Sequence, residues 1–137
     1  MQTVPKTQMG SEIDWLLSQP EPVRDRIIQS LPPSEYRALE DELYRWERFA
    51  RPDQREPPGD WFLWIMQCGR GWGKTRTAAE TVRARIDAGL CKTVNVAAPT
   101  WLDVMDTMVM GSAEAPGLMG VWPAHRKPSL RLSKDDP

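Results

Sequence analysis

The residues best suited to chemistry form a glycine-rich turn at positions 68–75, which reads Cys-Gly-Arg-Gly-Trp-Gly-Lys-Thr. Its glycines are Gly69, Gly71 and Gly73. Glycines let a backbone curl with its N–H groups directed inward, which is how a loop surrounds a phosphate group. Lys74 would reach the β and γ phosphates of a nucleotide, and Thr75 would place its hydroxyl on a bound magnesium ion. The turn therefore predicts a binding site for ATP and Mg2+.

Three residues of this turn need separate interpretation. The usual motif has a glycine, four free positions and then Gly-Lys-Ser/Thr, but Cys68 stands here where the first glycine belongs. Arg70 is either a solvent-exposed arginine without a role or a group that stabilises charge on the transferred phosphoryl group. Trp72 either shields the nucleotide or covers the ends of neighbouring strands. We take Lys74 and Arg70 as the candidate catalytic residues.

The segments on both sides of the turn predict a strand and a helix. Residues 61–68 form a short, nearly continuous apolar run, which is typical of a strand buried on both faces of a parallel sheet. Residues 74–88 predict a helix that ends at Gly89 and packs on the sheet through Ala78, Val82 and Ile86. Strand, glycine-rich turn and helix together favour a P-loop NTPase.

Two more elements continue this pattern. Residues 93–98 predict a second strand, and Thr100 with Asp103 forms a capping box for a helix over about 101–110. We therefore expect an α/β fold of the P-loop NTPase class, with a parallel sheet that is incomplete in this chain.

A helical segment precedes this region. Ser34 is a good N-cap for a helix over about 35–50, and apolar residues recur along one face of that helix at steps of three and four. Residues 51–60, with three prolines and a glycine, predict a connecting loop. The expected organisation is a helical N-terminal lead over 1–50 and the N-terminal part of the ATPase domain over 51–137.

Composition narrows the class of protein. The 137 residues suffice for one modest domain, and 40% hydrophobic with 27% charged residues is the range of ordinary globular proteins. A net charge of −1 indicates no particular partner. No stretch approaches the roughly 18 apolar residues of a membrane span, and the two cysteines have no partners at metal-ligand spacing. The prediction is a reduced, cytosolic protein without membrane contact.

Two sequence elements together resemble a known family. They are Ala-Arg-Pro-x-Gln, ending at Gln54, and Gly-Arg-Gly-x-Gly-Lys-Thr-Arg, beginning at Gly69. Within a stretch from about Trp46 to Leu132, the chain is similar to the large subunit of tailed-bacteriophage terminases, the motor that packs viral DNA into the procapsid. Ala98-Pro99-Thr100 and Gly111 continue the similarity.

The resemblance implies roles for individual residues. Gln54 would recognise the adenine, and Arg70 would contact the γ-phosphate or couple hydrolysis to movement. Lys74 and Thr75 would be the phosphate and magnesium residues of a nucleotide site that also includes Gly69, Gly71, Trp72 and Gly73. The resemblance further implies an ATPase with a separate nuclease domain, acting in the cytoplasm of the bacterial host. Its partners would be double-stranded viral DNA, the portal protein and the small terminase subunit.

One expected motif is missing from the sequence. Such an ATPase also needs an apolar strand ending in Asp-Glu, to hold the magnesium water shell and orient the attacking water. No stretch fits this pattern, and the carboxylates of a nuclease domain are missing as well. We expect either a fragment of a longer protein or a truncated prophage product, able to bind nucleotide weakly but without meaningful ATPase activity alone.

Two other functions fit the same residues. One is a different P-loop motor or helicase-like ATPase that acts on nucleic acid. The other is a non-enzymatic prophage remnant whose helical lead binds portal or small-terminase partners.

Overall fold

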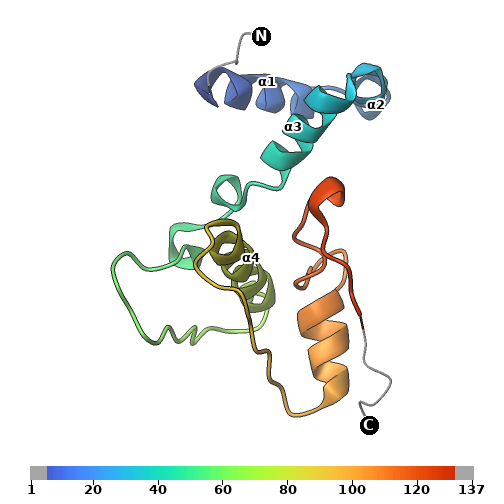
Figure 1. Cartoon of the computed structure of the whole chain (residues 1–137). Helices are drawn as coiled ribbons and strands as arrows, with labels where there is room; N and C mark the ends of the chain where they lie inside the picture. The colour runs from blue at the N-terminus through green and yellow to red at the C-terminus, as the bar shows by residue number, and fades with distance from the viewer. Residues whose placement is uncertain (1–5, 132–137) are drawn as a thin grey trace. The chain divides into compact units, whose positions relative to one another are not determined.

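The computed structural model describes residues 6–131, so Leu132, the last residue of the resemblance, lies outside the described part (Figure 1). The chain divides into two compact units, Met1–Leu43 and Tyr44–Pro137. The sequence predicted the boundary between the helical lead and the ATPase domain after residue 50, a position that lies inside the second unit. The candidate site lies wholly in the second unit.

The first unit consists of three helices in its described part, labelled in Figure 1 as α1 (Lys6–Ser18), α2 (Glu21–Ser30) and α3 (Pro33–Leu43). Helix α2 follows the extended residue Pro20 and carries Pro22 in its first turn, where the missing N–H costs no helical hydrogen bond. A helical lead, as the sequence predicted, is therefore present.

The helix predicted over about 35–50 is shorter than expected. It ends at Leu43, Arg45 is extended with ψ of 106°, and a single 3-10 turn η1 follows over Trp46–Arg48. The backbone carbonyl of Tyr44 accepts a hydrogen bond of 2.7 Å from the Arg83 guanidinium instead of continuing the helix. A contact between residues 39 positions apart thus interrupts a regular local pattern.

Helix α4 (Lys74–Asp87) is the main element of the second unit and confirms the helix predicted over 74–88. Gly73 precedes it in the left-handed region at φ 96°, and Gly89 follows it at φ 70°. The N–H of Leu90 reaches back to the carbonyl of Arg85 at 2.9 Å, which satisfies one of the carbonyls at the helix end. Glycines therefore delimit α4 at both ends.

The predicted parallel sheet is wrong. The structure is mostly helical, with 51% helix and 2% strand, and no sheet forms within residues 6–131. Segments 61–68 and 93–98, predicted as strands, are extended coil in Figure 1. An isolated bridge between Gly111 and Pro116 is the pairing that the structure shows in the described residues. An α/β fold of the P-loop NTPase class is therefore not what this structure has.

The predicted sheet does not form in the described part of the chain because an apolar run alone does not provide a neighbouring strand. The run at 61–68 favours an extended backbone, but a sheet also needs a second strand at hydrogen-bonding distance. Neither extended segment makes a backbone–backbone hydrogen bond within the described residues. Several of their apolar side chains are exposed to solvent, and Phe62 is fully exposed at 102%.

The helix predicted over 101–110 forms, although most of it is wound as a π-helix, η3 (Asp103–Met110). The Thr100 hydroxyl accepts the backbone N–H of Asp103 at 3.1 Å and donates to its carboxylate at 2.7 Å, so the predicted Thr100–Asp103 pair does cap the helix. The N–H of Gly111 bonds the carbonyl of Asp106 at 3.0 Å, an i to i−5 bond.

A charged cluster, formed by the buried Glu80 with Arg76 and Arg83, fixes α4 in the second unit. Glu80 is 1% exposed and lies 3.3 Å from Arg76 and 3.0 Å from Arg83. Arg83 also donates to the backbone carbonyls of Val121 at 2.8 Å and Tyr44 at 2.7 Å. Burial raises the pKa of the Glu80 carboxyl, and the guanidiniums of Arg83 and then Arg76 oppose that rise. The cluster links α4 to chain segments on both sides of it in sequence.

None of the helices within residues 6–131 combines the length and the apolar character needed to cross a membrane.

Candidate functional site

The glycine-rich turn leads directly into the first turn of α4. Gly71 and Gly73 take left-handed conformations, at φ 82° and 96°, whereas Gly69 does not. A residue with a Cβ adopts such angles only at a cost, so these two positions favour glycine. Two of the three glycines of the turn therefore adopt a conformation that favours glycine, and the turn leads to the N-terminus of a 14-residue helix.

The Lys74 side chain bonds back to the beginning of the glycine-rich turn. Its ammonium Nζ donates hydrogen bonds of 2.9 Å to the carbonyl of Cys68 and of 2.9 Å to the carbonyl of Gly69. The loop 68–73 therefore curls around the head of Lys74, and Cys68 contributes its backbone rather than its thiol. A positive charge is held at the centre of a curled backbone that opens into a helix N-terminus, which is an arrangement suited to an anion.

Thr75 and Arg70 take different positions at this site. Thr75 is half-buried in the first turn of α4, beside Lys74. Arg70 is exposed in the turn, together with Gly69 and Gly71. Both residues lie at the loop because they belong to it in sequence. The Arg70 guanidinium is accessible to a ligand that approaches from solvent.

Gln54 lies against the loop, so the two sequence elements meet in space. It ends the 3-10 turn η2 (Pro52–Gln54) and is only 5% exposed. Its Nε2 donates to the carbonyl of Trp72 at 2.8 Å, and its Oε1 accepts the backbone N–H of Arg51 at 3.1 Å. The position of a Cβ on Gly73 would lie 2.8 Å from that Nε2, so a side chain at this position would require the Gln54 amide to shift.

Trp72 provides the second contact between the 3-10 turn η2 and the glycine-rich loop. Its indole Nε1 donates to Asp53 Oδ2 at 2.9 Å. The Arg51 guanidinium donates to the carbonyl of Trp72 at 2.8 Å, lies 5.5 Å from the centre of its ring and is 3.4 Å from Asp53 Oδ1. We name this set the Trp72 latch: Arg51, Asp53, Gln54 and Trp72. Of the two roles predicted for Trp72, covering strand ends does not apply, because the described residues form no strands there.

Sequence reasoning missed Arg51 and Asp53. Both lie in the Ala-Arg-Pro-x-Gln element that carried part of the resemblance, so the signal was present in the chain. The resemblance implied a role for Gln54 and none for Arg51 or Asp53.

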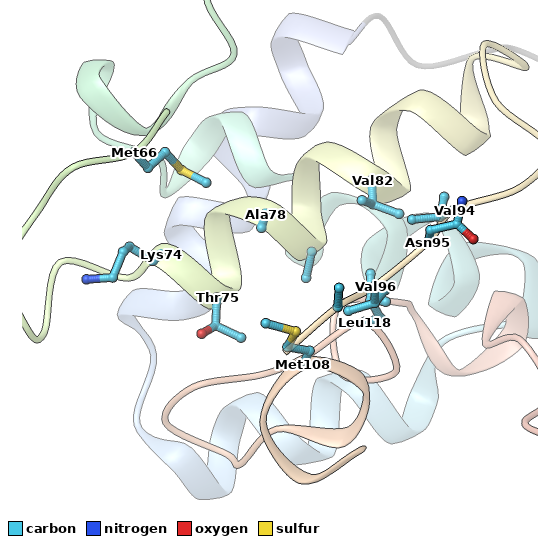
Figure 2. Close-up of a pocket in the computed structure, with 12 residues that line it drawn as sticks. Met66, Lys74, Thr75, Ala78, Val82, Val94, Asn95, Val96, Met108 and Leu118 are labelled. Carbon is cyan, nitrogen blue, oxygen red and sulfur yellow. The ribbon is translucent and has the colours of Figure 1, made fainter. Parts of the chain in front are cut away.

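A cavity of about 460 Å3 is lined in part by Lys74 and Thr75 (Figure 2). Most of its wall is apolar: Ala78 and Val82 from α4 face Val96, Met108 and Leu118. Figure 2 shows the Lys74 side chain directed away from this cavity. The α4 face that was predicted to pack on a sheet therefore borders open space, with Ile86 farther along it 41% exposed.

Carboxylates do not gather near the loop. Within the described residues, His, Cys, Asp and Glu form no group of three that could hold a metal ion.

Comparisons with models of protein families, with curated proteins and with solved structures find no match for this chain.

Proposed function

We propose that the loop 68–75 binds the phosphates of ATP with Mg2+, and that the chain is the ATP-binding portion of a motor resembling the terminase large subunit. The observation that supports the proposal best is the curled backbone around Lys74, whose ammonium is held by the carbonyls of Cys68 and Gly69. Two left-handed glycines and the N-terminus of α4 adjoin this ammonium, and such loops with a helix N-terminus bind anions.

Each residue has a part in this proposal. Lys74 exchanges its carbonyl partners for the β and γ phosphates, and Thr75 supplies a hydroxyl to Mg2+. The exposed guanidinium of Arg70 reaches the γ-phosphate from the solvent side. On this view the partners are those that the resemblance implies, namely viral DNA, portal protein and small terminase subunit, in the host cytoplasm.

The proposal is tested by titrating the 137-residue chain with Mg-ATP and following tryptophan emission. Trp72 lies in the loop, so a bound nucleotide is expected to change its emission. Trp72→Phe identifies the part of the signal that comes from this residue. We expect a saturable change in the wild-type chain that is absent in Lys74→Ala.

Lys92→Ala serves as the matched control, because Lys92 is an exposed lysine outside the loop. This variant should retain the wild-type response. A folded wild-type chain that shows no saturable change, or a Lys74→Ala variant that binds as well as wild type, would contradict the proposed function.

A further inference from the structure

The Trp72 latch joins a short turn to the phosphate loop across 18 residues of sequence. We propose that Gln54 and Asp53 are positioning residues, which hold the loop in its curled shape through Trp72, so that Gln54 acts on the phosphate site and not on the nucleotide base. This inference rests on the proposed function. It differs from the resemblance, which predicts that Gln54 recognises adenine.

The side-chain amide of Gln54 is engaged on both of its ends. The Arg51 N–H requires an acceptor and the Trp72 carbonyl requires a donor, so these two backbone groups fix which end of the amide is oxygen and which is nitrogen. The amide keeps a second N–H and a second oxygen lone pair, so access to these groups, and not bonding capacity, decides whether an adenine is read. With 5% exposure, Gln54 presents almost no surface to a ligand that arrives from solvent.

The hydrogen bond from Gln54 reaches the loop directly before the residue from which α4 begins. The carbonyl of Trp72 belongs to the peptide unit immediately before Gly73, the left-handed residue from which α4 begins. Gln54 Nε2 and the Arg51 guanidinium both donate to that carbonyl, at 2.8 Å each. Fixing its direction fixes the orientation of the next N–H groups, which are those that would face a phosphate.

Asp53 holds the other end of Trp72. Its carboxylate accepts the indole Nε1–H at 2.9 Å, while Arg51 lies over the ring of the same tryptophan. The backbone and the side chain of Trp72 are therefore both held by the turn that contains Gln54, and none of these contacts requires a ligand.

The test compares Mg-ATP with inorganic tripolyphosphate and Mg2+, because tripolyphosphate carries the phosphates without a base. If Gln54 positions the loop, Gln54→Ala should weaken both ligands by the same factor, about 3- to 10-fold for the loss of its hydrogen bonds. Loss of ATP binding with unchanged tripolyphosphate binding would overturn the inference, since only base recognition gives that pattern.

Asp53 offers a pair of variants with equal charge. Asp53→Asn keeps an oxygen acceptor for the indole N–H and Asp53→Ala does not, while both remove one negative charge near a site for anions. We expect Asp53→Asn to bind tripolyphosphate more tightly than Asp53→Ala, by about 3-fold or more. Equal affinities in the two variants would contradict a positioning role for Asp53.

A second measurement needs no ligand. The indole N–H of Trp72, identified in NMR spectra by its loss in Trp72→Phe, should exchange with solvent slowly in the wild-type chain and in Asp53→Asn. It should exchange at least about 3-fold faster in Asp53→Ala. If the indole N–H exchanges at the same rate in Asp53→Ala as in the wild-type chain, Asp53 does not hold Trp72. This result would contradict the inference whether or not a variant binds ligand.

The two proposals fail in different ways. A wild-type chain that binds neither ligand refutes the proposed function, whereas the exchange measurement still decides whether the latch holds the loop. A wild-type chain that binds both, with Gln54→Ala impaired for ATP alone, refutes only the further inference.

Discussion

The guanidinium of Arg83 lies 3.0 Å from the carboxylate of Glu80, one turn away on α4. Arg83 also donates to two backbone carbonyls, those of Tyr44 and Val121, which lie 39 and 38 residues away in sequence. One side chain thus neutralises a buried acid and joins three parts of the second unit. The helix that carries Lys74 and Thr75 is held in place by this contact, although neither residue takes part in it.

Arg83→Ala is therefore expected to destabilise the second unit strongly. The substitution removes the closer charged partner of Glu80 and leaves two carbonyls without their donor, so we expect a loss of about 3 kcal/mol in the free energy of unfolding. Urea denaturation followed by circular dichroism measures this loss. Arg70→Ala is the control, because Arg70 is exposed, and it should change the free energy by less than about 0.5 kcal/mol.

The buried carboxyl of Glu80 predicts a pH dependence of stability. Burial raises its pKa in the folded chain above the ordinary value of 4.5, so at pH values between the two pKa values the folded chain holds a proton that the unfolded chain has lost. The contribution of this group to stability is complete below about pH 4.5 and is lost as the pH rises through the folded pKa.

Glu80→Gln removes that titration and nearly preserves the shape of the side chain. The difference in unfolding free energy between wild type and Glu80→Gln should shift against the wild type as the pH rises from 4.5. A difference that stays constant across this range would show that Glu80 titrates alike in both states.

The three glycines of the loop should respond differently to alanine. Gly69→Ala is expected to change stability by less than about 0.5 kcal/mol, because Gly69 is not left-handed and a Cβ there meets nothing within 4 Å. Gly71→Ala should cost about 1–2 kcal/mol through its φ of 82° alone.

Gly73→Ala should cost the most, about 2 kcal/mol or more. It combines a φ of 96° with a Cβ position 2.8 Å from Gln54 Nε2. Thermal unfolding of the three variants gives the order, and a Gly73→Ala chain as stable as Gly69→Ala would show that the loop adopts another conformation in solution.

Arg70 should discriminate between nucleotides. If its exposed guanidinium contacts the γ-phosphate, Arg70→Ala should weaken Mg-ATP about tenfold while Mg-ADP, which lacks that phosphate, changes by less than about 2-fold. Isothermal titration calorimetry with both nucleotides measures the two constants. Equal losses for both nucleotides would place Arg70 on the α or β phosphate, or would reflect a general change in positive charge.

The sequence predicted what depends on neighbours along the chain. Helix α4 and the glycines that delimit it follow from periodicity and from the conformational freedom of Gly73 and Gly89. The resemblance also linked Gln54 to the glycine-rich loop, and the structure shows them in contact. These features are set by local backbone preferences or by two motifs read together.

What the sequence did not predict depends on distant partners. The segments 61–68 and 93–98 have the composition of strands, but composition does not supply the hydrogen-bonding neighbour that makes a strand. Helix α3 ends at Leu43 although the apolar stripe continues, and the next carbonyl, that of Tyr44, bonds the distant Arg83. The contact of Asp53 was not predicted because its partner, the indole of Trp72, is 19 residues away in sequence.

The extended apolar segment at 61–68 has a practical consequence for work in solution. Phe62, Leu63 and Ile65 are at least two-thirds exposed, and the backbone beside them offers donors and acceptors without partners in the described residues. Such a stretch is a template for pairing between molecules. Protein concentration thus becomes an experimental variable in its own right, and dilute samples with a charged substitution at Phe62 are the conditions in which single chains should be observed.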